Sequence, residues 1–178
     1  GETRVYLSKL DSNVEFLWSK IYWSSDPGYA NSIAGRKLEI FGGNVYITCV
    51  NAYNAYSATF ILKVSENDGT ISWFKKYSNP ADYLELRTLV HVYNNELYFG
   101  GRFNDNSSSS HQNILLKADT DGNILSSASY KNTTSNVSPI MEFMQHTNGN
   151  IYMASSFYET APFSNPVQIN VTVNSNLD

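Results

Sequence analysis

Two acidic residues occupy similar places in the sequence, each in or beside an apolar run. Glu85 and Glu142 could meet in one cleft, and a glycosidase needs two facing carboxylates about 5 Å or about 6.5–9.5 Å apart, depending on its mechanism. The chain has 16 acidic residues, so two in comparable positions are expected without shared chemistry. Because fold and function separate easily, we expect no catalytic residue and no enzymatic activity.

Metal-binding patterns are weak. His91, His111 and His146 lack the spacing of a zinc site. The single Cys49 lies in an alternating apolar segment, where a free cysteine usually packs as a small apolar residue. Asp119 begins an Asp-Thr-Asp-Gly-Asn stretch that resembles the start of a calcium loop but lacks the later Glu and the flanking helices. A hairpin turn is favoured there, and we expect no metal and no cofactor.

The composition excludes several classes of partner. The net charge is -4, from 12 basic and 16 acidic residues, which argues against nucleic-acid binding. No stretch of 18 apolar residues occurs, so we expect no membrane insertion. Asn, Ser and Thr make up 55 of the 178 residues, and Tyr and Phe are plentiful. This composition favours β-strands joined by polar turns.

A lysine-bearing apolar segment recurs along the chain. Its copies occupy residues 5–11, 59–65, 113–119 and 167–172, with Asn in the lysine position of the last. Lys9, Lys63, Lys117 and Asn170 are separated by 54, 54 and 53 residues. Alternating residues on these segments are apolar, as in a strand with two faces. The regular spacing predicts a repeated structural unit.

Three further segments recur at about the same spacing as the lysine segment. Tyr46, Tyr98 and Tyr152 each follow a Gly- or Asn-rich turn, and we expect all three to pack between sheets. Trp18 and Trp73 lie in segments 16–22 and 71–77 and are expected to pack likewise. The third copy of this segment, 125–130, has no Trp. We expect its tyrosine, Tyr130, to lie one position earlier than the tyrosines of the other two copies. Apolar runs at 33–40, 84–92 and 140–146 complete units of four short strands.

These units predict an all-β fold of β-propeller blades, each of four antiparallel strands. A period of about 54 residues gives about 3.3 blades in this chain. We expect a single β-propeller segment over 1–178, with a partial blade at 1–28, blades at 29–82 and 83–136, and a partial blade at 137–178. Both ends contribute a lysine strand, so they cannot complete one another. We expect a longer chain or other chains to supply the remaining blades.

The order of the motifs resembles the seven-bladed β-propeller repeat family. The resemblance is carried by Lys9-Leu10-Asp11, Trp18-Ser19-Lys20 and Gly43-Asn44-Val45-Tyr46, and it covers most of the chain in register. It departs where the first turn lacks Gly and where the third copy lacks Trp. The resemblance implies a secreted or cell-surface scaffold with no fixed catalytic residues.

Long loops between the strands are the expected binding face, since loops carry function more often than scaffold strands. Their aromatic residues are Trp23, Tyr29, Tyr53, Tyr56, Tyr83, Tyr158 and Phe163, set among Asn, Asp and Ser. Such surfaces suit sugar rings or protein partners. The same aromatic residues could equally cover the ends of the blades.

Four Asn-x-Ser/Thr patterns occur. Asn106, Asn132 and Asn136 fall in expected loops and are the glycosylation candidates, whereas Asn170 falls within a strand. A chain this rich in Asn, Ser and Thr should contain about four such patterns by chance. The number alone therefore indicates nothing about modification.

Three functions remain open. The first is a non-catalytic extracellular or cell-surface scaffold that binds protein, either its own chains or others, at open blade edges. The second is a subunit of a surface filament or adhesin that neighbouring chains complete. The third is a carbohydrate-binding or glycoside-processing propeller, with glycans as partners.

Overall fold

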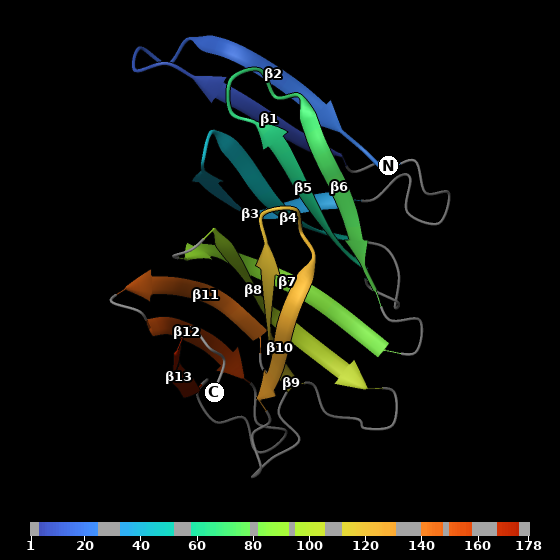
Figure 1. The fold of residues 1–178 in the computed structure, drawn as a ribbon, viewed down its shortest axis with the longest axis vertical. Helices are drawn as coiled ribbons and strands as arrows, with labels where there is room; N and C mark the ends of the chain where they lie inside the picture. The colour runs from blue at the N-terminus through green and yellow to red at the C-terminus, as the bar shows by residue number, and fades with distance from the viewer. Residues whose placement is uncertain are drawn as a thin grey trace.

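The computed structural model describes residues 4–24, 33–51, 58–78, 82–92, 95–105, 112–130, 140–147, 150–157 and 167–174. In this part of the chain every regular element is a β-strand (Figure 1). In chain order the strands are β1 (Val5–Leu10), β2 (Phe16–Tyr22), β3 (Ile33–Phe41), β4 (Asn44–Asn51), β5 (Thr59–Ser65), β6 (Ile71–Tyr77), β7 (Asp82–Val92), β8 (Glu96–Asp105), β9 (Gln112–Asp119), β10 (Ile124–Tyr130), β11 (Ile140–Thr147), β12 (Asn150–Phe157) and β13 (Val167–Asn174). The expected all-β class is confirmed.

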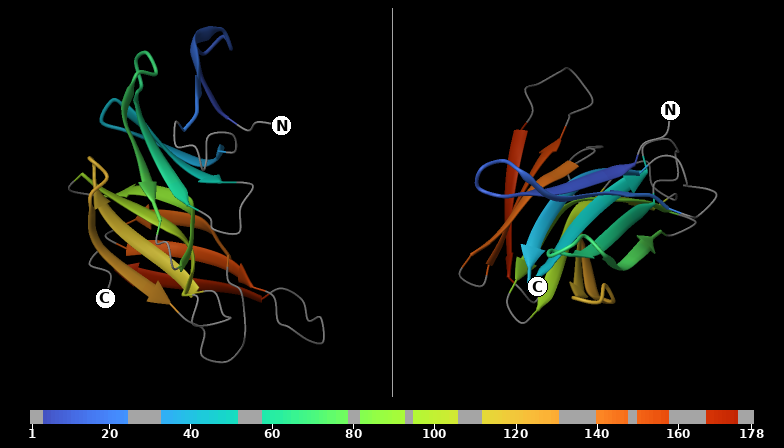
Figure 2. Two further views of the ribbon diagram at one scale, coloured as in Figure 1. Left: turned by 90° about the vertical axis from the view of Figure 1, so that its right-hand side faces the viewer. Right: turned by 90° about the horizontal axis from the view of Figure 1, so that it is seen from above.

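The strands form four antiparallel sheets in which each strand pairs with its neighbour in sequence. β3–β6 and β7–β10 have four strands each, β1–β2 is a hairpin, and β11–β13 has three strands in the described part of the chain. The sheets follow one another in chain order from the β1–β2 hairpin to β11–β13 (Figures 1 and 2). The expected apolar runs form β3, β7 and β11, within two residues at each end.

Two hairpin turns use residues that tolerate a left-handed backbone, whereas the turn between β1 and β2 places Val14 at φ of 68°. Gly42 and Gly43, between β3 and β4, have φ of 56° and 72°. Asn95 takes φ of 60° between β7 and β8. Glycine and asparagine adopt this conformation at low cost. These residues therefore close hairpins where the sequence predicts them.

The β3–β6 sheet has a buried face on each side. Val45, Ile47 and Cys49 belong to a core cluster that also contains Val5 and Tyr22 of the hairpin. Tyr46 and Ile61 point to the opposite side, where they join Leu97 and Phe99 of β8 in a second cluster. The expected two-residue alternation is confirmed here, because neighbouring side chains on a strand point to opposite faces.

Strands β3, β7 and β11 each contain a β-bulge at a comparable position, which the sequence did not predict. The register shifts between Gly35 and Lys37, between Leu86 and Thr88, and between Met141 and Phe143. Opposite the bulge in β7 lies Gly101, where a Cβ would overlap the Glu85 carbonyl oxygen and lie 2.7 Å from Leu86 Cα. Only a glycine fits this close backbone approach.

Two details of the expected repeat alignment are wrong. Tyr130 pairs with Asn113 just as Tyr77 pairs with Thr59, so it is not displaced along its strand. Opposite Tyr152 lies Thr172, whereas Asn170 pairs with Ala154. In the last copy, Thr172 therefore occupies the position of the repeated lysine. The apolar pattern repeats every two residues, so a shift of two positions preserves the faces and cannot be detected from the pattern.

Replacing Gly101 should destabilise the protein strongly. We expect Gly101→Ala to lower the free energy of unfolding by about 3 kcal/mol, since the new Cβ meets rigid backbone. Gly35→Ala is the matched control, because its Cβ would lie 3.7 Å from Ile47 and Val5, an ordinary contact distance. Urea unfolding of both variants tests this, and equal losses would contradict it.

Candidate functional site: the junctions between successive sheets

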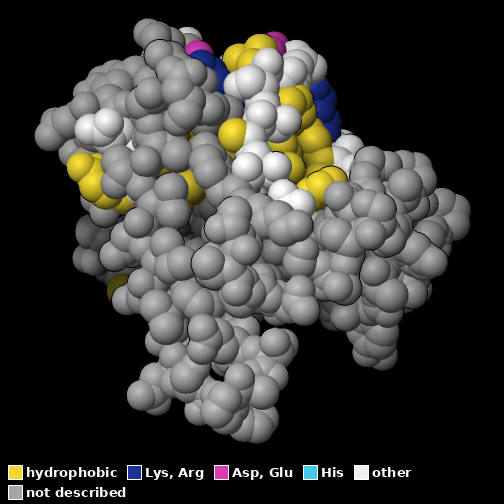
Figure 3. Space-filling model, turned by 90° about the horizontal axis from the view of Figure 1, so that it is seen from below, with side chains coloured by type: hydrophobic (Ala, Val, Ile, Leu, Met, Phe, Trp, Pro, Cys, Tyr) yellow, Lys and Arg dark blue, Asp and Glu magenta, His cyan; other side chains and the backbone are white. Residues whose placement is uncertain are grey.

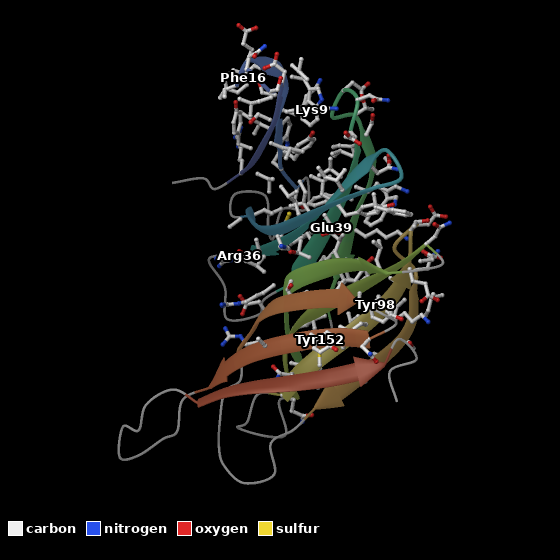
Figure 4. All side chains as sticks on the ribbon, turned by 90° about the vertical axis from the view of Figure 1, so that its left-hand side faces the viewer. Lys9, Phe16, Arg36, Glu39, Tyr98 and Tyr152 are labelled. Carbon is white, nitrogen blue, oxygen red and sulfur yellow. The ribbon has the colours of Figure 1, made fainter. Side chains whose placement is uncertain are left out.

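Three side chains of the first hairpin hold the turn between β5 and β6 (residues 66–70). Lys9 Nζ donates to the carbonyl oxygen of Glu66 at 3.2 Å and to its Oε1 at 3.2 Å. Trp18 Nε1 donates to the same carbonyl at 3.2 Å, and Tyr22 Oη donates to the carbonyl of Gly69 at 2.7 Å. Figure 4 shows Lys9 reaching from the hairpin toward this turn. We call this set the first clamp.

The same arrangement joins β5–β6 to the turn between β9 and β10 (residues 120–123). Lys63 Nζ donates to the carbonyl of Thr120 at 3.0 Å, and Trp73 Nε1 donates to it at 3.3 Å. Tyr77 Oη donates to the carbonyl of Gly122 at 2.6 Å. This second clamp repeats the first in residue type and in acceptor. Both satisfy turn carbonyls that lie at a packed junction, where an unpaired carbonyl is costly.

The glycine in each clamped turn is required twice over. Gly69 has φ of 70° and Gly122 has φ of 75°, a region that residues with a Cβ avoid. A Cβ on Gly69 would lie 2.9 Å from Tyr22 Oη, and one on Gly122 would lie 2.8 Å from Tyr77 Oη. A side chain at either position would have to displace the tyrosine and tryptophan of the clamp.

Asp119, the last residue of β9, forms hydrogen bonds with the second clamped turn. Asp119 Oδ1 accepts hydrogen bonds from the backbone N–H groups of Asp121 at 2.9 Å and Asn123 at 2.8 Å. Its Oδ2 accepts from Asn123 Nδ2 at 2.9 Å. The backbone N–H of Asn123 is the largest cause of a lowered pKa at Asp119. These bonds form the hairpin turn that the sequence favours over a calcium loop.

The third copy of the lysine strand does not make this contact to a following turn in the described residues. Lys117 Nζ instead pairs with Glu96 Oε1 of its own sheet at 2.8 Å. This hydrogen bond is the main cause of a raised pKa at Lys117. Ser126 lies opposite Lys117, where Trp73 lies opposite Lys63. Within the described residues, Lys117 thus makes its contact inside its own sheet.

The third of the repeated tyrosines, Tyr152, differs from the first two in its burial. Tyr46 and Tyr98 are buried, as expected, with exposed fractions of 1% and 0%. Tyr152 is 46% exposed, so the expectation that it packs between sheets is wrong. The described part of the chain therefore does not bury the Tyr152 side chain.

Burial governs the ionisation of several side chains near the junctions. It is the main cause that raises the pKa of Tyr46 and Tyr77 to about 12, with smaller contributions from Asp121 and Asp119 respectively. It also raises the pKa of the Cys49 thiol to about 12. Cys49 is a buried apolar-type residue, as expected, and its thiol stays protonated at neutral pH.

Among the expected aromatic loop residues, only the side chain of Trp23 is described. It is 58% exposed, and the Arg4 guanidinium lies 5.6 Å from its ring centroid. Tyr83 lies in β7, opposite Asn104, so its expected place in a loop is wrong. Outside the described residues lie Tyr29, Tyr53, Tyr56, Tyr158, Phe163, His111, Asn106, Asn132 and Asn136.

Glu85, one of the two acidic residues that could meet in a cleft, is buried in an ion-pair cluster. Its Oε1 accepts from Arg87 Nε at 2.8 Å, and its Oε2 accepts from Arg102 Nε at 2.7 Å. Two guanidinium groups thus compensate the buried charge. This favours a structural carboxylate over a general acid, which requires a carboxyl that retains its proton. The side chain of Glu142 lies outside the described residues.

The described part of the chain contains neither a candidate metal site nor a membrane-spanning helix. Its His, Cys, Asp and Glu side chains form no group of three or more that could hold a metal ion. Within the same residues, no helix is long and apolar enough to cross a membrane. In comparisons with known proteins, no family model and no curated sequence matches the chain. The repeated clamp is therefore the most distinctive site.

The clamp can be tested through its glycine. Gly122→Ala places a Cβ against Tyr77 and Trp73, whereas Gly42→Ala has a similar positive φ but nothing within 4 Å. We expect Gly42→Ala to cost about 1 kcal/mol of backbone strain, and Gly122→Ala to cost about 1–3 kcal/mol more through overpacking. Thermal and urea unfolding measure the difference, and equal costs would contradict a tight clamp.

The clamp also predicts a dependence on alkaline pH. The pKa of Tyr77 rises from 10.0 to about 12 on folding, so its stabilising contribution is complete below pH 10.0 and is lost as the pH rises to about 12. We expect the difference in unfolding free energy between wild type and Tyr77→Phe to stay constant below that range and to shrink within it. A difference that remains constant throughout would contradict the assignment.

Proposed function

We propose that this chain is a segment of a β-propeller that acts as a non-catalytic structural and binding scaffold. The observation that carries the proposal is the repetition of one clamp at two successive junctions. A contact that recurs with the same partners sets a constant rotation from each sheet to the next. Rotation repeated in this way leads to a ring or a helical array, and four-stranded antiparallel sheets are the units of propellers.

The finer features belong to the same proposal. They are a period of about 54 residues and about 3.3 blades in this chain. Placement outside the cell or at its surface rests on the resemblance to the seven-bladed β-propeller repeat family. The exposed Trp23 offers one aromatic face for a protein or glycan partner.

A second candidate is a subunit that neighbouring chains complete in a surface filament or adhesin. The observation that favours it is the set of exposed apolar side chains on the outer face of the β1–β2 hairpin. They include Tyr6 and Ile21, which are 59% and 51% exposed and lie beside the polar Ser8–Ser19 pair. Exposed apolar surfaces of this kind commonly mark interfaces.

The shape of the chain tests the scaffold proposal. We expect small-angle X-ray scattering at low protein concentration to fit sheets fanned about a common axis, because each clamp fixes the same rotation. Scattering from a straight stack of sheets would contradict a propeller.

A panel of glycoside, ester and phosphate substrates should show no turnover, and hydrolysis that purifies with the chain would contradict a non-catalytic role.

A further inference from the structure

The turn between β1 and β2 (residues 11–15) has the same hydrogen bonds as the clamped turn between β9 and β10. Each begins with an aspartate, Asp11 or Asp119, whose Oδ1 accepts from the backbone N–H groups two and four residues later. In each, the fourth residue has a left-handed backbone, with φ of 68° at Val14 and 75° at Gly122. The two turns therefore differ in the side chain at this position, and the backbone itself accepts an apolar residue there.

Residues 174–178 repeat the order of side chains in the valine turn. They read Asn-Ser-Asn-Leu-Asp, where residues 11–15 read Asp-Ser-Asn-Val-Glu. Asparagine, like aspartate, accepts backbone N–H groups in such turns. Residues 175–178 lie outside the described part of the chain, and their sequence predicts a turn of the apolar kind.

The strand register gives the place of the leucine in this turn. Pairing with β12 puts Thr172 where the other copies have the repeated lysine. Leu177 follows Thr172 by five residues, just as Gly122 follows Lys117 by five residues. The leucine thus corresponds to the glycine that the second clamp needs.

The strand that would face this turn, β10, lacks the two bulky side chains that face the second clamped turn from β6. A Cβ on Gly122 would lie 2.9 Å from the Trp73 ring and 3.1 Å from Lys75 Cδ. At the corresponding positions of β10 are Ser126 and Ala128, because the two strands pair with equivalent residues of β5 and β9. Serine and alanine leave free the space that the indole ring and the lysine chain fill in β6.

The surface of β10 also suits an apolar neighbour. Its seven residues include no charged side chain, whereas β6 carries Lys75 and Lys76. Lys117, beside Ser126, pairs with Glu96 of its own sheet at 2.8 Å. Seen from below the molecule, described hydrophobic side chains lie among white atoms of uncharged residues and backbone, with charged atoms toward one edge (Figure 3).

We propose that residues 174–178 form an apolar turn that docks on β10, with the Leu177 side chain filling the space beside Ser126 and Ala128. Side-chain volume is then exchanged across the junction, since a large residue in the turn meets small residues on the sheet. The second clamp has the reverse arrangement. Such an exchange keeps the total volume, whereas a change on one side alone leaves a cavity or an overlap.

The exchange determines which turn each sheet can accept. The strands β2 and β6, with their tryptophans, accept a glycine turn, and β10 accepts an apolar turn. Sheets of one repeated architecture thereby dock in one order, because each wrong pairing produces an overlap or a void. The inference goes beyond the scaffold proposal, since it holds whether or not the sheets close into a ring.

A double-mutant cycle tests the contact. Ser126→Trp should raise the equilibrium constant for unfolding by about tenfold or more, because the indole ring would overlap Leu177. In a chain that carries Leu177→Gly, the same substitution should raise it by less than about threefold, because the glycine leaves room for the ring. Urea unfolding of the four chains measures both changes. Equal changes in the two backgrounds would overturn the proposal.

Ser127→Trp is the matched control. It introduces the same side chain one position along β10, where the residue points to the opposite face of the sheet. Its effect on unfolding should be the same with Leu177 as with Leu177→Gly. A dependence on residue 177 as large as that of Ser126→Trp would also overturn the proposal, since the contact would then not be specific to one face.

Thiol modification tests the docking without a tryptophan, in case Ser126→Trp prevents folding. Val14 is 75% exposed in a turn of the apolar kind. Leu177→Cys should therefore react with a maleimide at least about tenfold more slowly than Val14→Cys, because β10 covers it. The native Cys49 is 0% exposed and adds no background. Equal rates for the two variants would overturn the proposal.

Discussion

Hydrogen bonds from one sheet to the turn carbonyls of the next join the first three sheets of this molecule. At both described clamps a lysine, a tryptophan and a tyrosine converge on two backbone oxygens, at distances of 2.6 to 3.3 Å. Backbone acceptors at a packed junction must be satisfied. Sheets that meet through such bonds cannot slide along one another without leaving several polar groups unpaired at once.

Other features follow from this constraint. The clamped turns need glycine because the tyrosine hydroxyl and the tryptophan ring occupy the space of a side chain. In the second clamp, Asp119 at the end of β9 holds the turn backbone by accepting from Asp121 N and Asn123 N. Where Trp is replaced by Ser126, Lys117 turns to Glu96 of its own sheet. The third lysine strand thus keeps Lys117 but lacks the tryptophan that the two described clamps share.

Much of the fold was predictable because strand patterns are local. Alternation of apolar residues identified the strands, and Gly and Asn marked the turns, since each depends on a few neighbouring residues. Predictions were wrong where pairing with the neighbouring strand sets the position of a residue. We predicted Asn170 at the fourth lysine position, but pairing with β12 places Thr172 there. Tyr83 joined β7 because Asn104 pairs with it.

By itself the sequence determined that the chain forms short antiparallel strands with two apolar faces, and that Cys49 is buried. These properties follow from side-chain period and local turn chemistry. Only the tertiary structure decided that Trp18 and Tyr22 bind the carbonyls of a turn 47 or 48 residues away. It alone also decided that Tyr152 is exposed whereas Tyr46 is buried. Both outcomes depend on which sheet lies opposite each residue, and spacing along one strand carries no information about that neighbour.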